Sequence, residues 1–179
     1  RRQRQMCIRD REKYHHMPVY MWPDKDVRDR KPAALEQVTA ELRDEVDFRI
    51  FLQYIFFKQW TALREYANEK GIQIIGDIPI YVSADSSDVW THPKLFKLKP
   101  DRSPKLVAGV PPDYYSATGQ LWGNPLYNWE YHRKTGYNWW ILRMTHCMKL
   151  YDKVRIDHFR GFDEYRWLPK PRHPHWGQF

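Results

Sequence analysis

The sequence predicts an α/β fold built on a parallel sheet. Two short runs rich in β-branched residues each carry an aspartate: IQIIGDIPIYV at residues 72–82 and VRIDHFRGF at residues 154–162. Each run follows a segment in which apolar residues recur at helical spacing. The order is therefore helix, strand, long excursion, helix, strand, and this alternation is typical of a parallel sheet with crossover helices.

The first part of the chain predicts a loop and two helices. Residues 13–30 combine charge with prolines and show no sustained period, which indicates a loop. Pro32 is typical of a first helical turn, and an apolar stripe follows it at Leu35, Val38, Leu42 and Val46. A longer helix is expected over about residues 46–69, with Gly71 as its stop. Its apolar face comprises Val46, Ile50, Tyr54, Phe57 and Leu63, with Trp60 beside them.

The second part predicts two strands joined by a long irregular excursion. Run 72–82 should be a buried strand with Asp77 at its end, and residues 83–128 should be mostly irregular and functional. Residues 129–151 predict one helix that leads directly into the last strand, with a stripe of Ile141, Met144, Met148 and Tyr151. Residues 169–179 hold three prolines and predict an irregular tail.

The bulk composition allows one domain and excludes some classes of function. The 179 residues suffice for a core, and 42% hydrophobic with 29% charged residues is ordinary for a globular protein. Aromatic residues reach 16%, enough for a core and for a groove that stacks on sugars or bases. No apolar run approaches ~20 residues and no secretory pattern is present, so we expect neither a membrane span nor a leader.

The net charge of +8 favours nucleic acid less than it first suggests. Residues 1–11, RRQRQMCIRDR, hold five Arg and one Asp. At every position this segment matches one reading frame of a common sequencing-library adapter, so we interpret it as not native and leave it out. Cys7 lies within this segment. The one remaining cysteine is Cys147, and so few cysteines are typical of a protein from a reducing compartment.

The last strand places an arginine beside an aspartate. Because side chains alternate along a strand, Val154 and Ile156 face one way while Arg155 and Asp157 face the other. The arginine would keep the carboxylate ionised, as a nucleophile requires, although a purely structural pair fits the pattern equally well. His15 and His16 lack further ligands at fixed spacing, so no metal site is expected.

Three motifs together resemble a known family. IIGDIPIYVSADSSDVW (74–90), VAGVPPDYYSATGQLWGNPLYNW (107–129) and VRIDHFRGF (154–162) are similar to the amylomaltases, the 4-α-glucanotransferases of glycoside hydrolase family 77. LQYIFFKQW (52–60) fits the same family, and the similarity spans about residues 20–168. Residues 169–179 depart from the family pattern.

The resemblance implies a partial (β/α)8 barrel over residues 12–168, with the aromatic-rich region 83–128 inserted between two barrel strands. It implies transfer of an α-1,4-glucan segment to a new 4-hydroxyl of a glucan or glucose, by a retaining double displacement. No cofactor and no metal are expected. The expected partners are α-1,4-glucans and maltooligosaccharides rather than nucleic acid or membrane. The expected location is the cytoplasm, or a plastid if the source is a plant or alga.

The resemblance also implies roles for particular residues. Asp157 matches the nucleophile, Arg155 the residue that orients it, His158 a hydrogen-bonding partner of the sugar at the cleavage point, and Asp77 a substrate-binding aspartate. Further substrate-binding positions are Tyr114 and Tyr115 in a closing loop, Trp122 in the cleft wall, Gln120 and Asn124. Trp139 and Trp140 are expected in the core instead.

The acid/base carboxyl that works with Asp157 is expected outside this sequence. Retaining chemistry needs it about 5 Å from the nucleophile, and the family carries it on the strand after the one that bears Asp157. Glu164 is too near Asp157 along the chain for that role. We therefore expect this stretch alone to be inactive. The alternative is a non-catalytic glucan-binding fragment, and a hydrolytic amylase relative and a nucleic-acid binder are the other rivals.

Overall fold

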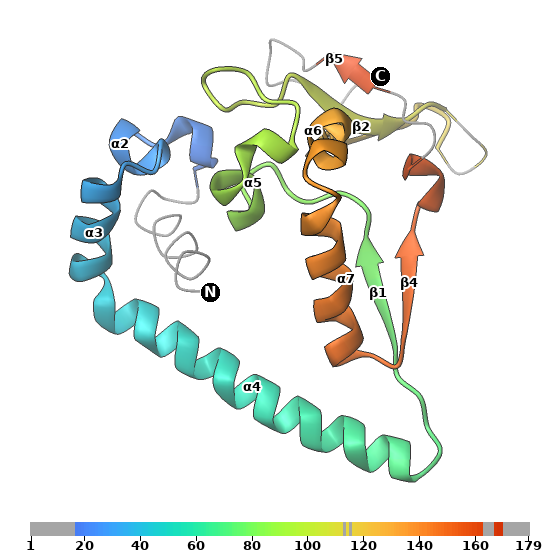
Figure 1. Cartoon of the computed structure of the whole chain (residues 1–179). Coiled ribbons are helices and arrows are strands. Elements are labelled where there is room, and N and C mark those ends of the chain that lie inside the picture. The colour runs from blue at the N-terminus through green and yellow to red at the C-terminus, as the bar shows by residue number, and fades with distance from the viewer. Residues whose placement is uncertain (1–16, 113, 115, 163–166, 170–179) are drawn as a thin grey trace.

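The computed structural model describes residues 17–112, 114, 116–162 and 167–169, and it combines helices and strands in a partial α/β fold (Figure 1). The predictions for residues 1–11 and 170–179 lie outside the described residues. The elements in order are η1 (Val19–Met21), α2 (Lys25–Arg28), α3 (Pro32–Glu41), α4 (Arg43–Glu69), β1 (Ile75–Pro79), α5 (Ser87–Thr91), η2 (Pro93–Leu95), β2 (Leu106–Val110), β3 (Gln120–Pro125), α6 (Trp129–Lys134), α7 (Asn138–Leu150), β4 (Lys153–Asp157), η3 (Phe159–Phe162) and β5 (Trp167–Pro169).

Strands β1 and β4 form the predicted parallel pair. They lie side by side and point the same way, with α7 beside them (Figure 1). The prediction for β1 was too long, because the strand covers only five residues and Asp77 lies at its middle. It was also wrong about full burial. Within the described residues β1 pairs with β4 alone, and alternate side chains such as Ile75 remain exposed.

The long helix α4 confirms the second predicted helix and begins three residues earlier than expected. Gly71 ends it as predicted, because its φ of +75° is a left-handed conformation that glycine adopts without strain. The second half of α4 contacts the junction of α7 and β4, where the Trp60 indole donates to the Leu150 carbonyl at 2.8 Å. Tyr54 and Leu63, predicted on the apolar face, are more than half exposed.

Residues 129–151 form two helices and not one. The chain breaks at Gly136 and Tyr137, whose φ angles of 61° and 55° are left-handed. The predicted apolar stripe is also wrong, since Ile141 is 58% exposed and Cys147 is buried instead. Aromatic and cationic side chains set the buried face of α7: the Arg143 guanidinium stacks over Trp140 and donates to the Pro79 carbonyl at 2.6 Å. Trp140 is buried, as predicted, and Trp139 is half-buried against the same core.

Residues 83–128 are mostly irregular, as predicted, but they also contain short regular elements. They hold α5, η2, β2 and β3, and β2 pairs antiparallel with β3 on one side and on the other with β5, which comes later in the chain. Pro169 belongs to β5 and pairs with Leu106, so it is not part of an irregular tail. Tyr127 lies at the centre of the core beneath this sheet and donates to the Ile80 carbonyl at 2.7 Å. Its burial raises its pKa above the ordinary value.

The predicted loop at residues 13–30 is folded where the structure describes it. Asp24 caps α2 by accepting hydrogen bonds from the amides of Asp26 and Val27. A second core joins this region to α3, α4 and α5, and it consists of Val19, Trp22, Val27, Val38, Val46 and Trp90. Short elements that alternate with prolines give no periodic signal, and this is why the sequence pattern missed them.

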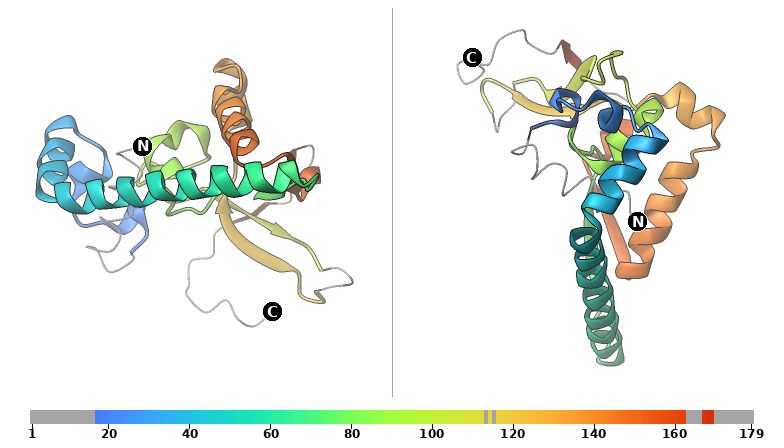
Figure 2. Two further views of the ribbon diagram at one scale, coloured as in Figure 1. Left: turned by 90° about the horizontal axis from the view of Figure 1, so that it is seen from below. Right: turned by 90° about the vertical axis from the view of Figure 1, so that its left-hand side faces the viewer.

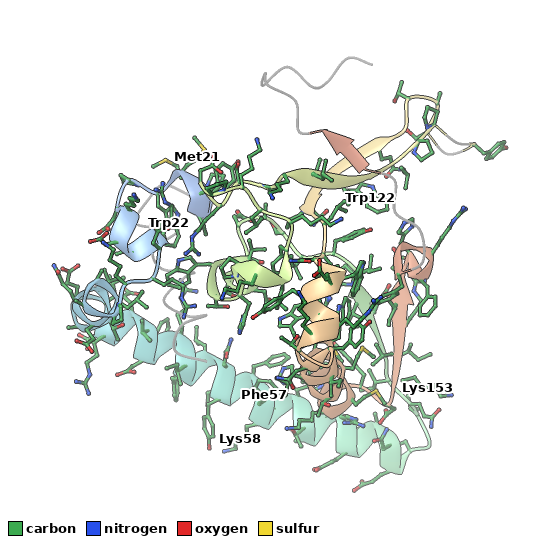
Figure 3. All side chains as sticks on the ribbon, turned by 45° about the horizontal axis from the view of Figure 1, so that its top comes forward. Met21, Trp22, Phe57, Lys58, Trp122 and Lys153 are labelled. Atoms are coloured by element: carbon green, nitrogen blue, oxygen red, sulfur yellow. The ribbon has the colours of Figure 1, made fainter. Side chains whose placement is uncertain are left out.

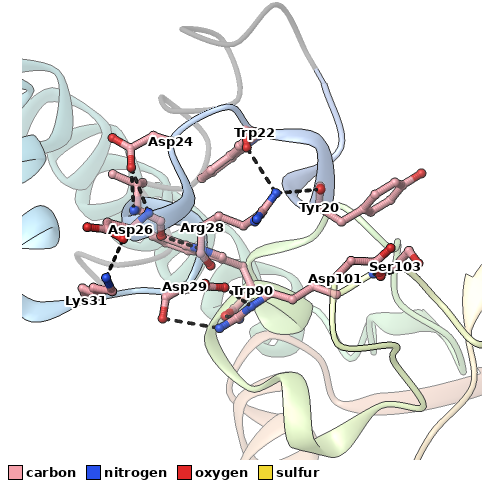
Figure 4. A network of polar contacts seen from close by, with 12 residues as sticks. Tyr20, Trp22, Asp24, Asp26, Arg28, Asp29, Lys31, Trp90, Asp101 and Ser103 are labelled. Carbon is pink, nitrogen blue, oxygen red and sulfur yellow. Dashed lines mark hydrogen bonds and ion pairs between the residues drawn. The ribbon is translucent and has the colours of Figure 1, made fainter.

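Polar contacts attach α2 to the rest of the molecule (Figure 4). The Trp90 indole donates to the carbonyls of Val27 and Arg28, and Arg102 Nε lies 3.1 Å from Asp29 Oδ1. Seen from below, α7 and the β2–β3 hairpin extend to opposite sides of the α4 axis (Figure 2). In the described part of the chain, no helix combines the length and apolar character needed to cross a bilayer.

Candidate active site

Three charged side chains meet on one face of the parallel pair. The register sets Asp77 opposite Arg155 and Pro79 opposite Asp157. Arg155 Nη2 lies 2.8 Å from Asp77 Oδ2 and 3.5 Å from Asp157 Oδ1. One guanidinium therefore bridges two carboxylates from neighbouring strands. The sequence predicted the contact of Arg155 with Asp157 and not its contact with Asp77.

These groups are open to solvent. The exposed fractions of the side chains are 64% for Arg155, 55% for Asp77 and 70% for Asp157. An exposed pair contributes little to folding stability, typically ~0–1 kcal/mol. Its main physical effect is to orient two carboxylates toward the same side of the sheet, where a ligand could reach both.

His158 follows Asp157 directly and turns back toward the β2–β3 hairpin. Its φ of 51° is left-handed, which is uncommon for a residue with a side chain. Its ring meets the Trp122 indole edge to face, with 4.9 Å between centroids and 87° between planes. Figure 3 shows Trp122 on the hairpin side of the turn that follows β4. Two segments distant in sequence thus meet beside the nucleophile candidate.

Trp122 is held by further contacts while part of it remains exposed. Its indole Nε1 donates to Gln120 Oε1 at 3.0 Å, and its ring lies 6.3 Å from that of the buried Tyr81. At 37% exposure, Trp122 presents some of its surface to solvent. The interpretation of Trp122 as a surface for a ligand, and not as core, is consistent with this placement.

The remaining predicted substrate-binding positions are Asn124, Tyr114 and Tyr115. Asn124 does not point freely into solvent, because its Nδ2 donates to the Val82 carbonyl at 2.9 Å and so attaches the hairpin to the segment after β1. Tyr114 is 97% exposed at the tip of the hairpin. Tyr115 lies outside the described residues.

Two residues that the sequence analysis missed support the site from behind. Tyr81 is buried beneath Trp122, and Gly161 is buried where the turn after β4 passes His158. The glycine in DHFRGF was a readable signal, because a glycine soon after a catalytic motif often marks a close approach of backbone. Tyr81 gave no signal beyond its place near a strand.

A partly buried carboxylate lies at the opposite end of the strands. Asp152 accepts from the Ile74 amide, the Asn68 side chain and Arg64, and these bonds lower its pKa to about 2. No three His, Cys, Asp or Glu side chains in the described ranges come together as a metal site. A pocket of about 340 Å³ between η2 and α6–α7 contains none of the predicted site residues.

Two exposed carboxylates bridged by an arginine on neighbouring parallel strands, with an aromatic side chain nearby, form the candidate active site of this α/β fold. A family model described as 4-alpha-glucanotransferase, glycoside hydrolase family 77, matches residues 5–178. The chain belongs to this family, as the three sequence motifs predicted.

Individual relatives agree with this assignment. The 4-alpha-glucanotransferase of Aquifex aeolicus is 54% identical over 150 residues, which cover 84% of this chain and 31% of that protein. The chloroplastic/amyloplastic 4-alpha-glucanotransferase of Solanum tuberosum is 48% identical over 143 residues, covering 80% and 25%. The amylomaltase of Streptococcus agalactiae, solved in complex with acarbose, superposes with a TM-score of 0.89 at 44% identity and covers 95% of this chain and 37% of its own. The chain thus spans between a quarter and somewhat more than a third of the length of these relatives.

Proposed function

We propose that the chain is the nucleophile-bearing part of a 4-α-glucanotransferase, which moves an α-1,4-glucan segment to the 4-hydroxyl of another glucan or of glucose. The observation that carries the proposal is the Arg155 guanidinium lying between Asp77 and Asp157. A cation placed between two carboxylates fixes their direction, and attack on a sugar carbon requires a nucleophile that is oriented in this way.

In this proposal Asp157 attacks the anomeric carbon and forms a glycosyl ester, while the leaving glucan departs with a proton from a separate acid. Arg155 orients Asp157, and Asp77 binds sugar hydroxyls from the neighbouring strand. His158 donates a hydrogen bond to the sugar at the cleavage point. The mechanism is a double displacement, so the acceptor hydroxyl then attacks the same carbon and configuration is retained.

The hairpin would supply the remaining recognition. Trp122 forms a wall for a sugar face, Gln120 and Asn124 lie on the same strand, and Tyr114 and Tyr115 cover the glucan from the hairpin tip. Aromatic cover of this kind excludes water while a bound sugar hydroxyl attacks the intermediate, which favours transfer over hydrolysis. Its support is the Trp122–His158 contact, since it joins the hairpin to the residue after Asp157.

The architecture that fits this function is a (β/α)8 barrel, the fold of the amylomaltases. Residues 12–168 would form a piece of the barrel, with β1 and β4 as two of its strands and residues 83–128 as the inserted region. The β1–β4 pair and the apolar residues left exposed on α4 are consistent with further strands and helices in the whole enzyme.

We further propose that the 179-residue chain performs no complete transfer, because no acid/base carboxyl in the described residues accompanies Asp157 on a third strand. The second candidate is binding of glucan without chemistry, which the exposed Trp122 and Asp77 would permit.

An activated donor separates these two functions. Fluoride leaves maltosyl fluoride without an acid, so Asp157 can displace it and form a maltosyl ester on its carboxylate even where the acid is absent. We expect intact-mass and peptide analysis to find one maltosyl adduct at Asp157, and none in Asp157→Asn. Acarbose binding without any adduct would select the binding function. The absence of both acarbose binding and labelling at Asp157 would contradict the proposal.

A further inference from the structure

We propose that Gly161 is a positioning residue: its lack of a side chain lets the turn after β4 press His158 against Trp122, so that the two rings act as one fixed unit beside Asp157. The role of this unit in glucan recognition rests on the proposed function. The geometry that fixes it stands on the contacts of the turn itself.

The turn after β4 is tight and closes on His158. The Gly161 amide donates to the His158 carbonyl at 2.8 Å, and this bond holds the left-handed conformation of His158. Gly161 itself is buried, while its neighbour Phe159 is 68% exposed. The backbone at Gly161 is therefore packed against the interior of the site and not toward solvent.

A β-carbon at Gly161 would meet three atoms at once. It would lie 2.9 Å from Ile80 Cδ1, 3.1 Å from His158 Cδ2 and 3.2 Å from the Tyr81 hydroxyl oxygen. Contacts this short force a neighbour to move. Tyr81 is held in the core, with its ring stacked on Tyr127 at 6.0 Å and 20°. Movement is thus left to the end of Ile80 or to the His158 ring.

On its other side, His158 has little room. Trp122 meets it at 4.9 Å, and Trp122 is in turn limited by its bond to Gln120 and by the ring of Tyr81. A displaced His158 therefore pushes the indole, and the sugar-facing surfaces of both rings change together. If Gly161 served only dense packing, Ile80 would yield and both rings would stay in place.

The test reads the two rings directly in the 179-residue chain. We would follow the Trp122 Nε1–H and the His158 imidazole signals by NMR, assigned through their loss in Trp122→Phe and His158→Gln. Gly161→Ala is expected to shift both signals and to weaken acarbose binding by about tenfold. Phe159→Ala, in the same turn, is the matched control and should shift neither ring comparably.

A rescue variant identifies the cause. Ile80→Val removes the methyl group that would lie closest to the new β-carbon, so Gly161→Ala combined with Ile80→Val should return both signals toward those of the unchanged chain. Unmoved rings in Gly161→Ala, or no recovery in the double variant, would overturn the inference.

Two further observations keep the inference testable. If Gly161→Ala does not fold, the unchanged chain must still show nuclear Overhauser effects from Gly161 Hα to His158 Hδ2 and from His158 to Trp122, and their absence would overturn it. If the unchanged chain shows the ring shifts but does not bind acarbose, the proposed function fails while the positioning role stands.

Discussion

Arg155 and Asp77 form an ion pair across the two parallel strands, with 2.8 Å between Nη2 and Oδ2. The same guanidinium nitrogen lies 3.5 Å from Asp157 Oδ1 on its own strand. The register of β1 with β4 decides this arrangement, because it sets Asp77 directly opposite Arg155. The arginine is thus shared between the nucleophile candidate and the substrate-binding candidate.

Arg155→Ala should reduce chemistry far more than stability. The pair is exposed, so the free energy of unfolding should fall by less than about 1 kcal/mol in a urea titration. Labelling of Asp157 by maltosyl fluoride should slow by about tenfold or more, ~1.4 kcal/mol in the barrier, because the nucleophile loses the cation that orients it. Lys153→Ala is the matched control, since Lys153 is an exposed cation on the same strand and face. Equal labelling in both variants would assign the ion pair to structure alone.

Asp152 should make stability depend on acid pH. Its folded pKa, about 2, lies below the ordinary 3.8, so the carboxylate stabilises the fold above pH 3.8 and this contribution is lost as pH falls toward about 2. The difference in urea midpoint between the unchanged chain and Asp152→Asn should therefore shrink across that window.

Arg64 supplies part of this effect. Arg64→Ala removes donors at 2.9 and 2.6 Å from Asp152 Oδ1, so the pKa of Asp152 should rise toward 3.8. The acid transition of the Arg64→Ala variant should then begin at a higher pH, measured by the same titrations. An unchanged midpoint would mean that the Ile74 amide and Asn68 hold the carboxylate without Arg64.

Truncation of two tryptophans should affect different properties: Trp90→Ala should mainly lower stability, and Trp122→Ala should mainly weaken glucan binding. Trp90 is fully buried in the core that joins α2, α3, α4 and α5, so Trp90→Ala should cost about 3–5 kcal/mol of unfolding free energy. Trp122→Ala should cost less than about 2 kcal/mol, since Trp122 is 37% exposed. Of these two variants, calorimetric titration with acarbose should show weaker binding for Trp122→Ala and unchanged binding for folded Trp90→Ala. A large loss of unfolding free energy in Trp122→Ala would indicate that Trp122 is a core residue and not a surface for a ligand.

The chain should not disproportionate maltotriose. Loss of general acid/base help typically slows such reactions by about 10²–10⁴-fold, and the described strands provide no third carboxylate for that role. Chromatography of products after long incubation is the measurement, with the full-length Aquifex aeolicus relative as the positive control. Glucose and longer maltooligosaccharides formed by the chain, and still formed by Asp157→Asn, would contradict both the inactivity and the assigned nucleophile.

Strong local signals predicted their elements well. Pro32 begins α3, Gly71 ends α4, and the β-branched run with alternating side chains became β4 with Arg155 and Asp157 on one face. Each of these features depends on neighbours in the sequence, through a fixed φ, a permitted left-handed turn or the period of a strand.

Elements with weak or competing local signals were predicted poorly. The stripe that includes Ile141 predicted the wrong face of α7, because Arg143 and Trp140 dock on the core through stacking and carbonyl contacts that hydrophobic periodicity does not register. The β2–β3 hairpin within the mostly irregular residues 83–128 was not predicted, because its strands contain glycine and proline and are stabilised by pairing between segments that are separated in sequence.

The sequence by itself determined the family, the two aspartate-bearing strands and the identity of the charged and aromatic residues near them. Only the tertiary structure decided that Arg155 also bridges to Asp77 and that Gly161 and Tyr81 lie behind the pair of Trp122 and His158. The physical reason is that chemistry and local conformation reside in single residues and short motifs. Distances between strands and hairpin depend on register and packing, which are set by contacts made across dozens of residues.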